Sequence, residues 1–269
     1  MSNFFKRLIT GTVFVTVIVA GILWSQYSYF LVFLTAVLLG ILEFSGILKS
    51  GRMNVDRTLA LLTGLFWYAC TFLILAGKIN AVWLSLIIPM SLLVFVVELY
   101  RKSDTPLQNI AATLLVPLYI ALPFSALHYL VFFTGEYVSS LLLGFFVLVW
   151  SNDTGAYLVG VTLGKHKLFP GISPKKSWEG FVGGVIFAQL AAYFVSMTGA
   201  APDLIHWMAI ALIVSVVGTY GDLVESMIKR SFDLKDSGNI LPGHGGILDR
   251  FDAVLFAAPM ICVYLMLLL

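Results

Sequence analysis

Long apolar runs alternate with short polar loops along almost the whole chain. A helix that crosses the hydrocarbon core of a bilayer needs about 20 consecutive, mostly apolar residues. Nine runs approach this length, and they cover residues 6–24, 28–48, 58–77, 81–99, 107–131, 138–162, 178–198, 204–221 and 249–268. The pattern therefore predicts an all-α, polytopic membrane protein, a helical bundle of about nine transmembrane helices.

The composition supports this class. The chain has 269 residues, of which 60% are hydrophobic and 11% charged, whereas soluble domains carry about 25% charged residues. The net charge of +2 is too small to indicate nucleic-acid binding. Cys70 and Cys262 both lie in apolar runs, where we expect small buried side chains and no disulfide or zinc site. The lipid bilayer is therefore the expected environment, with no nucleic-acid partner.

The basic residues predict the orientation in the membrane. If the N-terminus is cytoplasmic, the alternating loops place 15 of the 16 Lys and Arg residues on the same side, and only Lys78 on the other. Lys and Arg are enriched in cytoplasmic loops. The sequence thus predicts a cytoplasmic N-terminus, an outside C-terminus, and cytoplasmic loops at 163–177 and 222–250.

The two halves of the chain differ in polar content. Residues 1–135 hold about five spans and little chemistry, so we expect a scaffold. Glu43 and Glu98 lie within a turn or two of the predicted cytoplasmic interface, where packing, snorkelling or ion pairing outweighs the functional role that a membrane carboxyl otherwise indicates. Residues 136–269 are predicted to form a catalytic membrane domain.

A polar pair interrupts the sixth apolar run. Asn152 and Asp153 lie in mid-span, where insertion of a charged residue costs about 2.5–3.5 kcal/mol. We therefore expect both side chains to face a polar cavity.

A lysine pair precedes the seventh run. Lys175 and Lys176 stand immediately before Ser177, which is placed to cap the following helix. The positive end of a helix dipole and its free N–H groups attract anions. This arrangement favours a phosphate site.

Carboxylates gather at the ends of the last two runs. Asp222, Ser226 and Lys229 are spaced i, i+4 and i+7, so they share one helix face with Glu225 beside them. Asp249 and Asp252 are spaced i and i+3 at the start of the last run. Several carboxylates with basic residues nearby favour a hard cation such as Mg²⁺ together with phosphate groups.

The stretch from Ser226 to Asp252 resembles the signature of phosphatidate cytidylyltransferases, also called CDP-diacylglycerol synthases. The pattern is S-x-x-K-R, four residues, K-D, and later H-G-G-x-x-D-R-x-D. Its fixed positions are Ser226, Lys229, Arg230, Lys235, Asp236, His244, Gly245, Gly246, Asp249, Arg250 and Asp252. The segment S-P-K-K-S-x-E-G from Ser173 also resembles this family, and more loosely CTP-dependent polyprenol kinases.

The resemblance implies that CTP and phosphatidic acid are converted into CDP-diacylglycerol and pyrophosphate. It also implies a need for Mg²⁺, assistance by a monovalent cation such as K⁺, and a homodimer. The expected location is the cytoplasmic membrane of a bacterium, with the active site facing the cytoplasm.

Each candidate residue receives a role from the residue chemistry and the resemblance together. Metal ligands are expected at Asp222 and Asp249, with Ser226 and Asp252 as accessory ligands. Phosphate-gripping or catalytic bases are expected at Lys175, Lys176, Lys229, Arg230, Lys235 and Arg250. Further substrate contacts are expected at Asn152, Asp153, Ser177, His244, Gly245 and Gly246, with a loop-holding role open for His244. His128, His166 and His206 receive no role.

Two alternatives remain at this point. A CTP-dependent prenol or dolichol kinase, or a CDP-archaeol synthase, would use related chemistry on another lipid. A transporter or channel would use Asp153 and Asp222 as a cation path, but the charges collect on one predicted side and no inverted repeat is visible.

Overall fold

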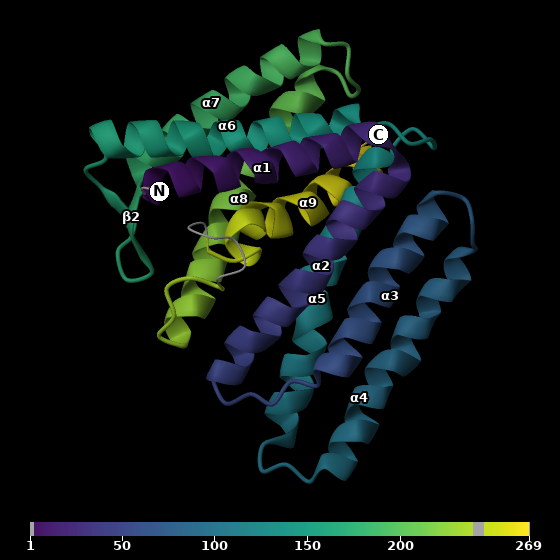
Figure 1. The fold of residues 1–269 in the computed structure, drawn as a ribbon. Coiled ribbons are helices and arrows are strands. Elements are labelled where there is room, and N and C mark those ends of the chain that lie inside the picture. Colours follow the sequence, from purple (N-terminus) through teal and green to yellow (C-terminus); the bar gives the residue numbers. More distant parts are fainter. Residues whose placement is uncertain (1–2, 239–244, 269) are drawn as a thin grey trace. The chain divides into compact units, whose positions relative to one another are not determined.

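A computed structural model describes residues 3–238 and 245–268. Within them the chain forms nine α-helices, one 3-10 helix and one small hairpin of two strands (Figure 1). The elements are α1 Asn3–Trp24, α2 Gln26–Ser50, α3 Arg57–Leu75, η1 Ala81–Leu86, α4 Ile87–Arg101, α5 Pro106–Val131, α6 Ser140–Leu163, β1 Lys167–Phe169, β2 Ser173–Ser177, α7 Trp178–Met197, α8 Leu204–Ser231 and α9 Leu248–Leu268. The predicted all-α class is confirmed.

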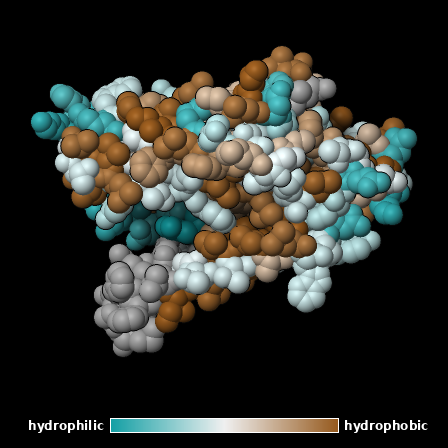
Figure 2. Space-filling model, turned by 90° about the horizontal axis from the view of Figure 1, so that it is seen from above, coloured by the Kyte–Doolittle hydropathy of each residue, from teal (hydrophilic) through white to brown (hydrophobic). Residues whose placement is uncertain are grey.

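Eight helices in the described residues are long and apolar enough to cross a membrane, with η1 and α4 counted as one span. The apolar part of α1, Ile9–Trp24, is shorter. Many large hydrophobic side chains are exposed, and Figure 2 shows them in brown over much of the face drawn there. Lipid chains suit such a surface, so the protein is an integral membrane protein. The orientation of its termini stays a prediction.

The chain divides into two compact units. The first contains residues 1–137 and 232–250, and the second contains residues 138–231 and 251–269. The segment 232–250, which the sequence prediction grouped with the second half, thus belongs to the same unit as α1 to α5. The division into scaffold and catalytic domain stays a prediction.

In the first unit α2 and α3 begin at side-chain caps, and the helices enclose an aromatic core. Ser25 caps α2 by accepting a hydrogen bond from the backbone N–H of Ser28 at 3.1 Å. Asp56 caps α3 in the same way. The fully buried ring of His128 lies between Tyr29 and Tyr68, with Nδ1 2.9 Å from the Tyr29 hydroxyl and Nε2 3.1 Å from the Tyr68 carbonyl oxygen.

Those two contacts assign the protons of His128. A carbonyl oxygen only accepts hydrogen bonds, so Nε2 carries the hydrogen and donates it to Tyr68. In the neutral ring, Nδ1 then accepts a hydrogen bond from the hydroxyl of Tyr29. His128, which the sequence left without a role, joins three helices of the first unit.

A second polar group ties α3, α4 and α5 together at their ends. Arg101 contacts Asp56 at 3.0 Å and Glu98 at 3.1 Å. The other oxygen of Glu98 accepts a hydrogen bond from Asn109 at 2.7 Å. The expected ion-pair role of Glu98 is therefore confirmed, and this carboxylate stabilises the ends of three helices.

Glycines let helices approach closely in the second unit. A Cβ on Gly155 would lie 2.8 Å from the Gly183 carbonyl oxygen, and one on Gly180 would lie 3.1 Å from the Gly160 Cα. Real Cβ atoms rarely come so near, so α6 and α7, side by side in Figure 1, pack along these glycines. Small residues at the interface of two helices commonly allow such close packing in membrane proteins.

The connection between α6 and α7 is a hairpin instead of a plain loop. β1 and β2 pair antiparallel, with Lys167 opposite Ser177. The Glu179 carboxylate accepts hydrogen bonds from the backbone N–H groups of Lys165 and His166, and its Oε1 lies 2.5 Å from the His166 ring. These contacts fix the hairpin, and with it Lys175 and Lys176, against the start of α7.

Candidate active site

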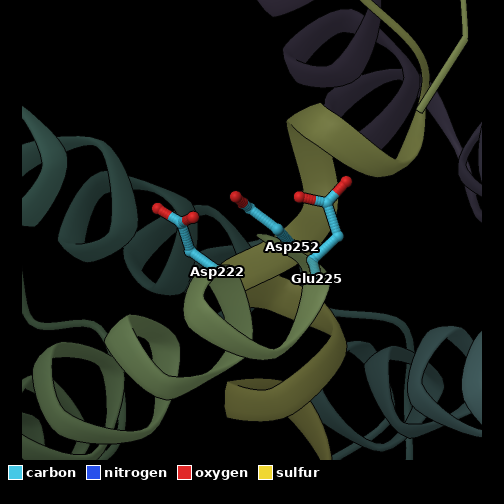
Figure 3. A group of neighbouring side chains, drawn as sticks. All are labelled: Asp222, Glu225 and Asp252. Atoms are coloured by element: carbon cyan, nitrogen blue, oxygen red, sulfur yellow. The ribbon is translucent and has the colours of Figure 1, made fainter. Parts of the chain in front are cut away.

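Three carboxylates of the second unit meet where α8 and α9 pack together. One ligand oxygen from each of Asp222, Glu225 and Asp252 can be chosen so that all lie within 4.8 Å of one another. Figure 3 shows Asp222 and Glu225 on α8, with the Asp252 carboxylate of α9 between them. Asp222 and Asp252 were expected as metal ligands. Glu225 was noted beside them but not assigned as a ligand.

Two glycines of α8 bring these carboxylates together. A Cβ on Gly221 would lie 2.5 Å from the Asp252 carbonyl oxygen, and one on Gly218 would lie 3.2 Å from the Ala253 Cβ. The absence of both side chains lets α9 approach the backbone of α8. Because Gly221 directly precedes Asp222, the closest approach of the helices coincides with the acidic cluster.

Lysines neutralise part of this negative charge. The Lys176 Nζ atom, from β2, lies 2.5 Å from Asp222 Oδ2. The Lys229 Nζ atom lies 2.6 Å from Glu225 Oε2, and only 9% of the Lys229 side chain and 3% of the Glu225 side chain are exposed. Lys229, expected to grip a phosphate, is therefore paired with an acidic residue one turn away.

The remaining polar residues of the second unit surround this cluster or support it. Ser226 donates a hydrogen bond to Asp222 Oδ1 at 3.3 Å. Asp153 is exposed and interacts electrostatically with Asp252. Asn152 is buried, and its side chain lies where α6 meets Gly184 of α7.

The start of α7 is capped as predicted. Ser177 accepts a hydrogen bond from the backbone N–H of Gly180 at 3.2 Å. Lys175 is exposed, whereas its neighbour Lys176 is half-buried against Asp222. The two lysines thus have different environments, which their adjacent positions in the sequence did not reveal.

Asp249 belongs to the first unit and forms a turn with its own segment. Its Oδ2 atom accepts hydrogen bonds from Gly246 N at 2.8 Å, Ser237 N at 3.1 Å and Ser237 Oγ at 2.8 Å. Gly245 has a φ of +81°, and a Cβ there would collide with the Asp249 carboxylate. Gly245 therefore leaves room for the Asp249 carboxylate, and Gly246 likewise leaves room for the carboxylate of Glu43. The sequence did not reveal this reason for glycine at the two positions.

The exposed bases of the signature lie on both units. Arg230 is exposed at the end of α8, and Lys235 and Arg250 are exposed in the first unit. His244 lies outside the described residues.

Two carboxylates, one in each unit, were not predicted as site residues from the sequence. Glu225 was not predicted as a metal ligand, although its spacing of i+3 from Asp222 places both residues on the same helix face. Glu43 was given only a packing or ion-pair role, yet its carboxylate contacts Ser237, Ile247 and Leu248 of the signature segment. No local signal in the sequence could have linked residues so far apart.

The chemistry of the donor set in the second unit fits a hard divalent cation. Mg²⁺ is bound through one or two carboxylates and the oxygens of substrate phosphates. Asp222, Glu225 and Asp252 supply three carboxylates close together, and Lys176 and Lys229 offset part of their mutual repulsion. The arrangement can therefore hold a metal ion beside positively charged side chains.

Comparison with known proteins identifies the family. The model of the Cytidylyltransferase family matches residues 5–268, almost the whole chain. A protein of Bacillus subtilis named phosphatidate cytidylyltransferase is 55% identical over 114 residues, which cover 42% of this chain and 42% of that protein. Proteins of the same name from Staphylococcus saprophyticus and Staphylococcus aureus are 39% and 38% identical over 197 residues, 70% of this chain and 71% of each relative.

These similarities include both compact units, since the family match extends from α1 to the end of α9. They confirm the resemblance that the motifs indicated, and they favour it over the kinase and transporter alternatives. The chain belongs to the cytidylyltransferase family.

Proposed function

We propose that this protein is a CTP:phosphatidate cytidylyltransferase, which forms CDP-diacylglycerol and releases pyrophosphate in phospholipid biosynthesis. The family match over residues 5–268 makes it a CTP-using nucleotidyltransferase, and relatives in several bacteria carry the name phosphatidate cytidylyltransferase. The structural observation that carries the proposal is the cluster of Asp222, Glu225 and Asp252 beside two lysines.

The reaction joins two anions. An oxygen of the lipid phosphate forms a bond to the α-phosphorus of CTP, and the bond from that phosphorus to the bridging oxygen of the pyrophosphate group breaks. A phosphomonoester has its second pKa near 6, so the attacking oxygen is largely deprotonated at neutral pH. A strong general base is unnecessary, and the main task of the protein is to reduce repulsion and to align the two phosphates.

The residues of the second unit are suited to that task. Asp222, Glu225 and Asp252 would hold Mg²⁺, with Ser226 beside Asp222. Bound there, Mg²⁺ would supply positive charge to the phosphate oxygens of CTP. Exposed Lys175, and Lys176 when it leaves Asp222, would attract phosphates next to the start of α7.

Five further residues keep the roles that the sequence favours, whereas Asp249 and Lys229 receive different ones. Asn152 and Asp153 would contact nucleotide or metal, and the exposed bases Arg230, Lys235 and Arg250 would attract phosphates. Asp249, Gly245 and Gly246 would form a firmly shaped turn of the substrate site. Lys229, paired with Glu225, would chiefly balance the charge of the acidic cluster.

The location in the cell follows from the substrates and the charge distribution. We propose that the protein lies in the cytoplasmic membrane with its N-terminus and active site facing the cytoplasm, where CTP is found. It would act as a homodimer, with K⁺ as an additional cation. Both of these last features come from the family resemblance.

One assay tests the function. Purified protein in detergent with phosphatidate is given labelled CTP and Mg²⁺, and the products are separated. Labelled CDP-diacylglycerol and free pyrophosphate are expected, whereas release of CDP would indicate a kinase. The absence of CTP-dependent lipid labelling by the folded protein would overturn the proposal.

A further inference from the structure

In the first unit the carboxylate of Glu43, on α2, accepts hydrogen bonds from Ser237 and from Ile247 and Leu248. Glu43 is 8% exposed. Its Oε1 atom accepts a hydrogen bond from Ser237 Oγ at 2.7 Å. Its Oε2 atom accepts from the backbone N–H groups of Ile247 at 2.7 Å and Leu248 at 3.2 Å. One side chain therefore fixes two points of the segment 237–248.

The contact at Ile247 and Leu248 stabilises the start of α9. The first N–H groups of a helix have no partner inside the helix, and negative charge is favourable at that end. α9 begins at Leu248, so Glu43 provides from another helix the acceptor that a capping residue normally supplies. The direction of the first turn of α9 depends on this carboxylate.

Ser237 connects Glu43 to Asp249. Its hydroxyl oxygen lies 2.7 Å from Glu43 Oε1 and 2.8 Å from Asp249 Oδ2. A hydroxyl has only one hydrogen to donate, so the two carboxylates share it. Asp249 in turn accepts from the backbone of Gly246 at 2.8 Å. Glu43 thus supports the residue that the sequence predicts as a metal ligand.

The shape of the segment matches the Glu43 side chain. A Cβ on Gly246 or on Gly238 would collide with the Glu43 carboxylate. Glycine is therefore required at Gly246 by a close approach, since its backbone lacks the positive φ found at Gly245. The backbone at these two glycines is thus complementary in shape to the distant Glu43 carboxylate.

We propose that Glu43 is a positioning residue for cytidylyl transfer: it holds Ser237, Gly246 and the first turn of α9 in the shape that presents Asp249 to the substrates. This inference rests on the proposed function. The Glu43 oxygens accept hydrogen bonds from the Ser237 hydroxyl and from two backbone N–H groups. The residue therefore acts by holding this segment and does not touch the reacting atoms.

Two substitutions of Glu43 distinguish a role in positioning the segment from a general contribution to the stability of the protein. Glu43→Ala removes all three contacts. Glu43→Gln keeps them, because the amide oxygen accepts from Ile247 and Leu248 while the amide nitrogen donates to Ser237, whose hydroxyl then donates to Asp249. The matched control is Glu98→Ala, which removes a carboxylate of similar burial, 4% exposed, that bonds to Asn109 and Arg101 instead.

The first readout is amide hydrogen exchange of the full-length protein in detergent. In Glu43→Ala, faster exchange is expected at Ile247 and Leu248, whereas Glu98→Ala leaves those amides protected. If Glu43→Ala does not fold, Ser237→Ala removes only the shared hydroxyl and is expected to raise exchange at Gly246. Unchanged exchange across this segment in the folded variant tested would overturn the proposal.

The second readout is the kinetics of transfer. A misplacement of about 1 Å can lower a rate about 100-fold, so Glu43→Ala is expected to lower kcat/KM for CTP by one to two orders of magnitude. Glu43→Gln should recover most of that loss, and Glu98→Ala should keep the KM for CTP of the wild type. Wild-type kinetics in folded Glu43→Ala would contradict the inference. Failure of the wild type to label lipid would instead contradict the proposed function, and the exchange result would still stand.

Discussion

The ammonium group of Lys176 lies 2.5 Å from Asp222 Oδ2, so a base of the β2 strand is paired with an acid of the cluster of Asp222, Glu225 and Asp252. Two functions predicted separately from the sequence, phosphate binding and metal binding, therefore meet at one ion pair. A cation that binds Asp222 must compete with Lys176.

That competition predicts the effect of Lys176→Met. Without the ammonium group, the carboxylates are expected to bind Mn²⁺ or Mg²⁺ several-fold more tightly in the absence of CTP, because the nearby positive charge is gone. Transfer should nevertheless slow, since a phosphate-binding group is lost. Titration with Mn²⁺ followed by electron paramagnetic resonance measures the first effect. Lys175→Met, at the exposed neighbouring position, should leave metal affinity almost unchanged, and equal effects of both substitutions would contradict this assignment.

Glu225→Gln tests a carboxylate that the sequence did not place among the predicted metal ligands. Loss of a carboxylate from the cluster of Asp222, Glu225 and Asp252 is expected to lower transfer about 100-fold or more at a fixed Mg²⁺ concentration. Part of the activity should return at high Mg²⁺, because weaker binding is overcome by mass action. The control is Asp203→Asn, at an exposed acid just before α8. A wild-type Mg²⁺ requirement in Glu225→Gln would remove this residue from the metal site.

Gly221→Ala tests how the helices bring the acids together. The added methyl group would lie 2.5 Å from the Asp252 carbonyl oxygen, so α8 and α9 must move apart. We expect a loss of about 1–3 kcal/mol in stability, as for overpacked cores, and a larger loss of activity. Gly171→Ala, where a Cβ meets nothing within 4 Å, is the control for thermal unfolding and for lipid labelling. Normal activity in Gly221→Ala would show that the close approach is unimportant.

Lys229→Met distinguishes charge balance from phosphate binding. Removing one partner of a buried ion pair costs about 3–5 kcal/mol, and Lys229 and Glu225 are 9% and 3% exposed. A marked fall in the unfolding temperature is therefore expected. The double variant Lys229→Met, Glu225→Gln should regain part of that stability, because the remaining buried charge is removed. If the single variant unfolds like the wild type, the pair is not a structural one.

His128→Phe tests the polar contacts in the core of the first unit. A larger aromatic ring replaces the imidazole, and the Tyr29 hydroxyl and the Tyr68 carbonyl oxygen lose their partners. Each buried group left unsatisfied costs about 1–3 kcal/mol. A lower unfolding temperature with an unchanged KM for CTP is expected, and a changed KM would indicate that His128 has more than a structural role.

The sequence alone determined the class, most of the membrane-spanning helices and the residue types on which the proposed chemistry depends. These features depend on local patterns: runs of about 20 apolar residues, and the 3.6-residue period that aligns Asp222 and Ser226 on one face of α8. Both residues are in contact in the structure. The helix cap at Ser177 was predictable for the same reason, since it involves residues three apart.

The tertiary structure decided which distant groups meet. The sequence predicted Asp249 as a leading metal ligand and Asp252 as an accessory one, both at the start of α9. In the structure, Asp252 lies with Asp222 and Glu225, whereas Asp249 accepts hydrogen bonds from Ser237 and Gly246. Lys176 reaches Asp222 only because residues 167–177 form a hairpin, which the positive charges of a cytoplasmic loop did not predict.

Glu43 illustrates the physical limit of sequence reading. Its partner Ser237 lies 194 residues away, and neither hydropathy nor helical period carries information over that separation. Such a contact depends on how whole helices pack and where a missing Cβ, as at Gly246, leaves room for a carboxylate. The sequence determined which chemical groups this protein has, and the packing of its helices decided which of them act together.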